Sequence, residues 1–183
     1  MRLWEITNDL IDKVSMLVIT DEDRHNLHFW DQFGGDGAEI QWTKRPKLQP
    51  FVDKKKKKQK PRADISPFRP GSLALNGKTH DALGDFLSQF GQLLEIDVLG
   101  DVEYYYNVTN VIPAIDRERS EVLPGGFIKK AAFDESVIPA QASLFKDAVT
   151  RSSIFVNDAA KSELEKRIVD SGITGMSFRQ VSD

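Results

Sequence analysis

The sequence predicts an α+β fold in which a mixed, mostly antiparallel sheet is packed by at least two helices, with two strand-helix-strand units in the C-terminal part. Three observations lead to this expectation. Short β-prone runs recur along the chain, two later segments carry apolar residues at helical spacing, and each of these segments follows a strand that ends at an asparagine. With 183 residues, 40% of them hydrophobic and 29% charged, the chain can bury a core of its own.

Residues 1–45 are expected to form a β-rich part. Arg2–Thr7 alternates its larger apolar groups in the manner of a short strand, and Ser15–Thr20 is a second β-prone run. Asp21–Arg24 starts a turn or a short helix.

A glycine-rich connection, Gly34–Gly37, follows in this part of the chain. Glycine supplies the positive φ angles that hairpin turns require, so the flanking segments His25–Phe33 and Ala38–Trp42 are predicted to form a hairpin. A helix through Arg24–Gln32 is the alternative.

Residues 46–70 differ sharply in composition from their surroundings. Five prolines bracket the five consecutive lysines Lys54–Lys58. Like charges repel and proline removes a backbone donor, so this Pro/Lys-rich segment is predicted to be an exposed loop and the part of the chain most prone to disorder.

The formal net charge of −3 conceals a strong asymmetry. Ten of the 25 Lys and Arg residues lie between Lys44 and Arg62, where Asp53 is the single acid. The rest of the chain has 15 basic and 27 acidic residues, a net charge of −12. Such an acidic body repels nucleic acid and favours basic partners.

Residues 71–183 are expected to form a C-terminal α+β part that packs with residues 1–45 as one unit. Ser72–Leu75 is predicted to be a strand, and apolar residues at helical spacing predict a helix over His80–Leu94, capped by Asn76 or Thr79. The expected continuation is two strands and a connecting segment: Glu95–Val98, Val102–Val108, and Ile112–Arg119 leading into a loop at Pro124–Gly126.

The last third of the chain repeats this order of elements. Ser153–Val156 is predicted to be a strand, Asn157 or Asp158 a cap, and Gly172 the end of a helix that runs to Ser171. Thr174–Val181 closes the pattern as a strand. The repetition is either an internal pseudo-repeat or a coincidence of two common motifs.

Few residue patterns in the sequence favour catalysis. His25 and His28, close to Asp21, Glu22, Asp23 and Asp31, have metal-ligand chemistry, but zinc needs three or four converging ligands, and two surface histidines are the simpler interpretation. Phosphate-binding loops, nucleophile elbows and cysteines are absent from the sequence, so we expect no catalytic residues and no cofactor.

Two other segments raise the question of binding partners. The run Lys54–Lys58 can neutralise phosphates, but no aromatic residue interleaves with it to read bases, so a solvated loop is favoured over a nucleic-acid site. In Glu103–Tyr106, alternate strand residues point to opposite faces, so Tyr105 is expected to oppose Tyr104 and Tyr106. Tyrosines serve protein interfaces as well as cores. Asp116–Glu121 is a mixed-charge stretch, either solvated and self-compensated or part of a partner-binding loop.

These strings also carry a family resemblance. Tyr105–Ile112 and Ala114–Glu121 resemble the signature of the Imm11 family of bacterial immunity proteins, also labelled DUF1629. Leu73–Asn76, Gly91–Leu94, Ile154–Asn157 and Gly172–Phe178 are similar to flanking segments of that family, so the resemblance covers Leu73–Val181 well and the first 70 residues more loosely.

The resemblance implies a cytoplasmic immunity protein that neutralises a cognate secreted toxin by direct stoichiometric binding. The toxin is expected to be encoded by an adjacent gene, and the acidic body would complement the basic face of a nuclease. The family supplies no agreed site residues. The residues predicted for partner binding are therefore exposed acidic and aromatic ones: Glu103, Tyr104, Asp116, Glu118 and Glu121. The alternatives are a nucleic-acid-binding module that uses Lys54–Lys58 and a metal-dependent enzyme at His25 and His28. We expect no membrane partner, because no apolar run of about 18 residues is present.

Overall fold

The computed structural model describes residues 1–8, 12–25, 33, 35–53 and 58–182. Its elements follow in chain order: β1 (Leu3–Thr7), β2 (Leu17–Ile19), α1 (Asp21–Arg24), β3 (Lys47–Pro50), β4 (Val52–Asp53), β5 (Lys58–Gln59), β6 (Ile65–Ser66), β7 (Leu73–Leu75), α3 (Gly77–Leu87), β8 (Gly91–Val98), β9 (Asp101–Val108), β10 (Ile115–Val122), β11 (Ile128–Phe133), the 3₁₀ turn η1 (Glu135–Val137), β12 (Leu144–Phe145), β13 (Phe155–Asn157), α4 (Asp158–Ser171) and β14 (Ser177–Gln180). None of the helices among the described residues is long and apolar enough to cross a membrane.

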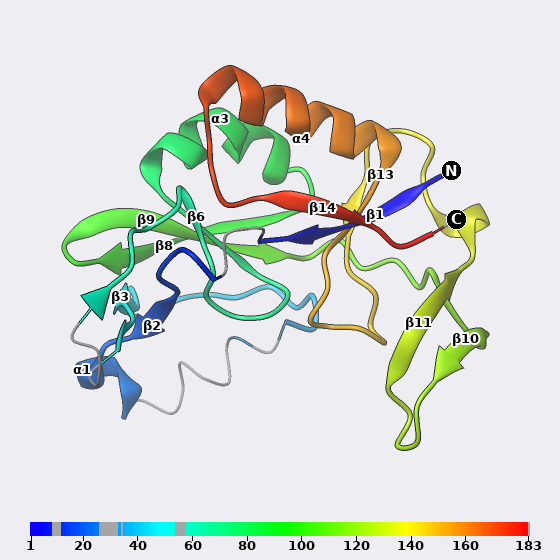
Figure 1. The fold of residues 1–183 in the computed structure, drawn as a ribbon, viewed down its shortest axis with the longest axis horizontal. Helices are drawn as coiled ribbons and strands as arrows, with labels where there is room; N and C mark the ends of the chain where they lie inside the picture. The colour runs from blue at the N-terminus through cyan, green and yellow to red at the C-terminus, as the bar shows by residue number, and fades with distance from the viewer. Residues whose placement is uncertain (9–11, 26–32, 34, 54–57, 183) are drawn as a thin grey trace.

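The predicted α+β class is confirmed, with strands in two main sheets and two smaller pairs. The six-stranded sheet has the order β2-β3-β8-β9-β7-β6, and only its β3–β8 pair is parallel. The four-stranded sheet, β12-β13-β1-β14, is antiparallel throughout. Helices α3 and α4 lie side by side over one face of these sheets (Figure 1).

The two strand-helix-strand units share one topology. Strands β7 and β8 both pair antiparallel with β9, which lies between them, and α3 connects them. Strands β13 and β14 likewise flank β1, and α4 connects them. Each unit therefore has two parallel strands separated by a third, so the order seen in the sequence corresponds to a repeated arrangement in space.

Each helix of these units begins at the predicted asparagine. The Asn76 side chain accepts a hydrogen bond from the Thr79 N–H, and the Asn157 side chain accepts one from the Ala160 N–H. Helix α4 ends at Gly172, whose φ of +63° is the left-handed conformation that glycine adopts without steric cost. The predicted caps and the predicted C-terminal end of α4 are confirmed.

The two capping asparagines make different additional hydrogen bonds, so their replacement should affect stability differently. The buried amide of Asn157 also donates to the Pro139 and Gln141 carbonyls, at 3.0 and 2.7 Å. We expect Asn76→Ala to lower the free energy of unfolding by about 1 kcal/mol and Asn157→Ala by about 2 kcal/mol. The Asn76 amide makes one further hydrogen bond, to the Asp64 carboxylate, whereas Asn157→Ala removes both bonds to backbone carbonyls and the bond that Asn157 accepts from the buried Ser143 N–H. Urea unfolding of both variants measures the difference, and equal losses would contradict this account.

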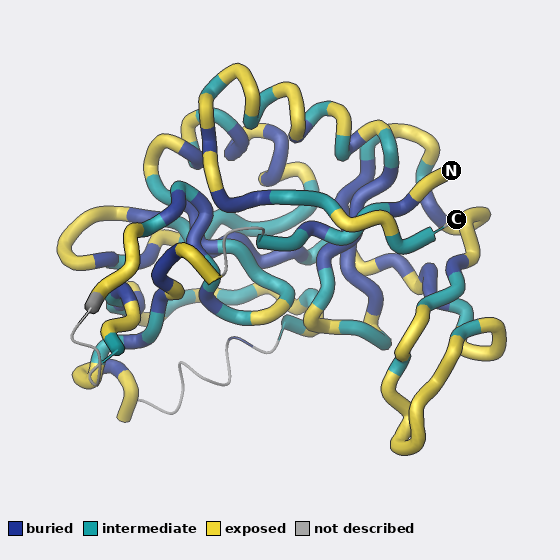
Figure 2. Tube along the Cα trace, viewed as in Figure 1, coloured by how far each residue is buried: buried dark blue, intermediate teal, exposed yellow. Residues whose placement is uncertain are grey.

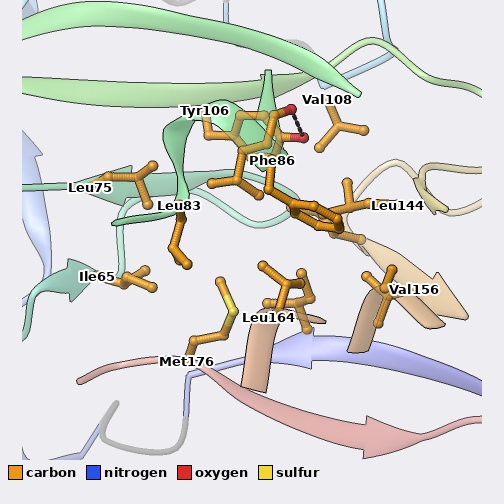
Figure 3. Close-up of a cluster of buried hydrophobic side chains, with 14 of the residues drawn as sticks. Ile65, Leu75, Leu83, Phe86, Tyr106, Val108, Leu144, Val156, Leu164 and Met176 are labelled. Atoms are coloured by element: carbon orange, nitrogen blue, oxygen red, sulfur yellow. Dashed lines mark hydrogen bonds between the residues drawn. The ribbon is translucent and has the colours of Figure 1, made fainter. Parts of the chain in front are cut away.

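Tyr106 packs in the core between the helices and the sheets. Its ring is fully buried, and its hydroxyl donates to the Leu87 carbonyl at 2.9 Å (Figure 3). Tyr105 lies in a separate cluster on the other face of the six-stranded sheet, packed edge-on against Phe33 and Phe68. The predicted opposition of Tyr105 to its two neighbours is confirmed, since Tyr104 packs against the first cluster.

The predicted helix over His80–Leu94 is wrong in its second half. Helix α3 ends at Leu87, and β8 begins at Gly91, where an added Cβ would lie 2.2 Å from the Asn107 carbonyl oxygen of β9. Leu93 and Leu94 pack into clusters on opposite faces of the sheet. A strand buried on both faces shows a continuous apolar run, which here coincides with helical spacing.

The prediction that residues 46–70 form an exposed loop is also wrong over much of its length. Strand β3 lies between β2 and β8, with Leu48 1% exposed, and Ile65 and Phe68 are buried as well. Proline lacks a donor but keeps its acceptor, and the Pro61 and Pro67 carbonyls accept from N–H groups of the β2 segment at 2.8 and 2.7 Å.

The predicted hairpin around Gly34–Gly37 is wrong in its second strand, while residues 26–32 lie outside the described part of the chain. Ala38–Trp42 forms no strand and is held to the sheet by side chains instead. The Gln92 amide pairs with both backbone groups of Ile40, at 2.8 and 3.1 Å, and Asn107 donates to the Ala38 carbonyl at 2.8 Å.

Candidate partner-binding surface

Three of the five residues predicted for partner binding lie on the β10–β11 hairpin. Among the described residues, these two strands pair only with each other. The hairpin projects from one end of the body, and most of it is exposed (Figures 1 and 2). Its tip is a tight loop in which the Leu123 N–H donates to the Phe127 carbonyl at 2.8 Å. The sequence prediction placed a loop at Pro124–Gly126 but did not identify the hairpin that this loop closes.

The root of the hairpin is fixed in the body. Ile115 and Phe133 are buried in a cluster with residues of the four-stranded sheet, and the Phe133 ring meets Phe155 edge-on, with centroids 5.3 Å apart. The buried carboxylate of Asp147 accepts from the Ile115 N–H at 2.8 Å and from the Val149 N–H at 2.7 Å. The hairpin therefore starts from a rigid base, although its outer half is exposed.

The pairing of β10 with β11 becomes irregular in the outer half of the hairpin. The pairing register shifts between Asp116 and Glu121, and the Ser120 hydroxyl replaces a ladder partner by accepting from the Ala132 N–H at 2.9 Å. The same hydroxyl donates to the Asp116 carbonyl at 2.5 Å. Irregular pairing interrupts the ladder between the anchored root of the hairpin and its outer half, which projects from the body as an arm (Figure 1).

The charged side chains of this arm pair mainly with one another. Asp116 accepts from the Arg119 guanidinium at 2.5 Å, and this hydrogen bond lowers the pKa of the Asp116 carboxyl group. Glu121 accepts from Lys129 at 2.6 Å. Glu118 is exposed and makes no ion pair with a described residue. Between Asp116 and Lys130 the arm has four basic and three acidic residues, so it is slightly basic.

The apolar tip of the arm is the feature that the sequence-based prediction missed. Val122, Leu123 and Phe127 are 42%, 46% and 73% exposed, and they flank the Pro-Gly-Gly turn. A cluster of exposed apolar side chains on a projecting element is typical of a protein-binding surface. Apolar residues on both sides of a Pro-Gly-Gly sequence are themselves a hairpin signal, so the sequence contained the information.

The other two predicted residues lie elsewhere. Glu103 and Tyr104 are in the first half of β9, near the β8–β9 turn at the opposite end of the molecule (Figure 1). Glu103 is 4% exposed and accepts two hydrogen bonds from Arg62, at 2.5 and 2.6 Å, so the expectation that it is exposed is wrong. Tyr104 is half-buried, with its ring stacked on His80 at 3.8 Å and 14°.

The described surface also has a shallow charged hollow of about 470 Å³ beside the start of α3. Its lining includes Arg62, Asp64, Lys78 and Glu103, which are joined in pairs: Arg62 with Glu103, and Lys78 with Asp64 at 3.7 Å. Pairing satisfies these charges, and the lining offers no nucleophile activated by a neighbouring base. The hollow therefore gives no support to a catalytic interpretation.

Comparison with known proteins does not assign the chain to a family. No model of a known protein family matches the chain, and no curated protein matches it.

The remaining predicted sites fall largely outside the described residues. His25 follows α1, whereas His28 lies outside the described part. Residues 54–57 also lie outside it, so the lysine-based nucleic-acid alternative stays a prediction. Within the described ranges, no group of three or more His, Asp or Glu side chains is arranged to hold a metal ion.

Proposed function

We propose that this protein is an immunity protein that binds and neutralises a cognate toxin, and that the tip of the β10–β11 hairpin is its main contact. The proposal rests on one observation above all: an anchored arm presents Val122, Leu123 and Phe127 to solvent. The resemblance of Leu73–Val181 to the Imm11 family supports the toxin as partner. The cytoplasm of the producing cell is the compartment that this function requires.

The geometry suits insertion of the hairpin into a cleft of the partner. A fixed root reduces the entropy lost on binding, and phenylalanine is one of the aromatic residues enriched in protein interfaces. The paired charges along the arm lie beside a shallow hollow of about 390 Å³, lined by Arg119, Glu121, Lys130 and Ser182. Such a polar border fits the rim of an interface.

Electrostatic attraction between the two proteins would act over a longer range than the apolar contact at the hairpin tip. The arm itself is slightly basic, so attraction of a basic toxin such as a nuclease would come from the acidic remainder of the chain, which has a net charge of −12 outside Lys44–Arg62. Steering of this kind raises the association rate and weakens with salt, whereas the apolar contact mainly slows dissociation.

The decisive experiment is co-expression with the protein encoded by the adjacent gene, followed by co-purification at moderate and high salt. A one-to-one complex that relieves toxicity would support the proposal. No complex and no protection would contradict it. Salt-sensitive binding to DNA or RNA that is lost when Lys54–Lys58 become alanine would favour the nucleic-acid alternative instead.

The hairpin is tested by Phe127→Ser. This change removes an aromatic group that is 73% exposed and contributes little to the core, so we expect folding to be unchanged and the dissociation constant of the complex to rise about 30-fold. Val169→Ser is a matched control, because Val169 is an exposed apolar residue, 78% accessible, on α4. Titration calorimetry measures both variants, and equal affinities for the two would rule out the hairpin as the main contact.

A further inference from the structure

The turn between β8 and β9 holds an unusual leucine. Val98 pairs with Asp101, so Leu99 and Gly100 form a two-residue turn, with φ of +58° and +96°. Leu99 is the one residue other than glycine with positive φ among those described. Its side chain is also 70% exposed.

Both properties disfavour leucine at this position. A left-handed backbone brings the Cβ of an L-residue too close to the carbonyl oxygen, and turns of this geometry strongly prefer Asn-Gly or Asp-Gly. Exposure of a large apolar side chain brings no gain from burial. Asparagine would suit the backbone and the solvent better, so the folded chain alone does not explain the leucine. Strained residues are concentrated at functional sites.

The surroundings of Leu99 indicate the chemistry of what it would meet. Val102 in β9 is 43% exposed and adds apolar area. Asp97 and Asp101 flank the turn, and neither forms an ion pair within the described ranges, although Asp97 accepts from the Gly100 N–H at 2.7 Å. The tip is thus apolar with two carboxylates beside it, and its complement is an apolar pocket bordered by basic groups.

We propose that the β8–β9 turn, through Leu99 and Val102, is a second contact for the toxin, received by an apolar pocket with a basic rim. This inference rests on the proposed function and extends it. The turn lies at the end of the molecule opposite to the β10–β11 arm (Figure 1), so a partner that reaches both must run along its long axis. The interface is then expected to exceed the standard of about 800 Å² per partner.

Leu99→Asn separates binding from stability. Asparagine relieves the strain, so we expect the melting temperature to rise by about 2 to 4 °C, while the dissociation constant of the complex with the adjacent-gene protein rises about tenfold. Leu99→Met keeps a long apolar side chain and the strained backbone, and it is expected to bind within about threefold of wild type. Thermal unfolding and titration calorimetry give both values.

The outcomes distinguish this inference from the proposed function. A higher melting temperature and weaker binding in Leu99→Asn, together with near-normal binding in Leu99→Met, support the second contact. If Leu99→Asn binds the partner as tightly as the wild-type chain does, the second contact is wrong and the proposed function is unaffected. Absence of binding by the wild-type chain overturns both proposals.

Discussion

Replacement of Arg62 by methionine is expected to lower the free energy of unfolding by about 3 kcal/mol, because it leaves the Glu103 carboxylate buried without its partner. Glu103 is 4% exposed and receives both of its charge-assisted hydrogen bonds from Arg62. The guanidinium also donates to the Ser66 hydroxyl at 3.2 Å, which joins β6 to β9 across the sheet. The Arg62 side chain remains 25% exposed, so the estimate is at the lower end of the range for fully buried pairs.

The effect is measured by urea unfolding and needs two further variants. The double variant Arg62→Met, Glu103→Met replaces both charges with apolar groups and is expected to recover most of the lost stability, since it buries no unpaired charge. Arg179→Met removes an ion pair with Glu5 in which the arginine side chain is 69% exposed, and it should cost less than about 1 kcal/mol. A loss in Arg62→Met no larger than in Arg179→Met would show that burial of Glu103 carries no such penalty.

The stability of the protein is expected to rise with pH between about 8 and 10.5 because of Lys146. This side chain is 2% exposed, and burial lowers its pKa from 10.5 to about 8. Its ammonium group donates to the Gly35 and Arg151 carbonyls, at 3.0 and 3.2 Å, and forms no ion pair with a described residue. Between these two pH values the unfolded chain binds the proton that the folded chain has released, so raising the pH favours the folded state.

Deprotonation of Lys146 is expected to raise the free energy of unfolding by about 3 kcal/mol. This gain is fully present above pH 10.5 and is lost as the pH falls to about 8. Other groups titrate in the same range, so the informative quantity is the stability of wild type minus that of Lys146→Met, measured by urea unfolding at several pH values. Lys129→Met, at a lysine that is 56% exposed, is the control, and its difference from wild type should stay nearly constant. A flat difference for Lys146→Met as well would refute the lowered pKa.

The sequence alone determined the local features whose causes lie within a few residues. Asn76 and Asn157 cap helices because a short side chain there can reach a free N–H three residues on, and Gly172 ends α4 because it tolerates a positive φ. Alternation along β9 sent Tyr105 and Tyr106 to opposite faces. These features require no knowledge of the rest of the chain, and they were sufficient to predict the α+β class.

Tertiary structure decided the remaining features. The prolines and lysines of residues 46–70 indicated a loop, but β2 and β8, which are distant in sequence, hold Leu48 in a sheet. The Ile65 N–H likewise donates to the carbonyl of the distant residue Thr174. Glutamate is ordinarily a surface residue. Glu103 can be buried because the Arg62 guanidinium donates hydrogen bonds to both of its carboxylate oxygens. Phe127 is apolar like the core residues, yet the hairpin carries it into solvent. Burial depends on which distant segments meet, so the sequence could identify the caps and turns but could not show which apolar and charged side chains the fold buries and which it leaves in solvent.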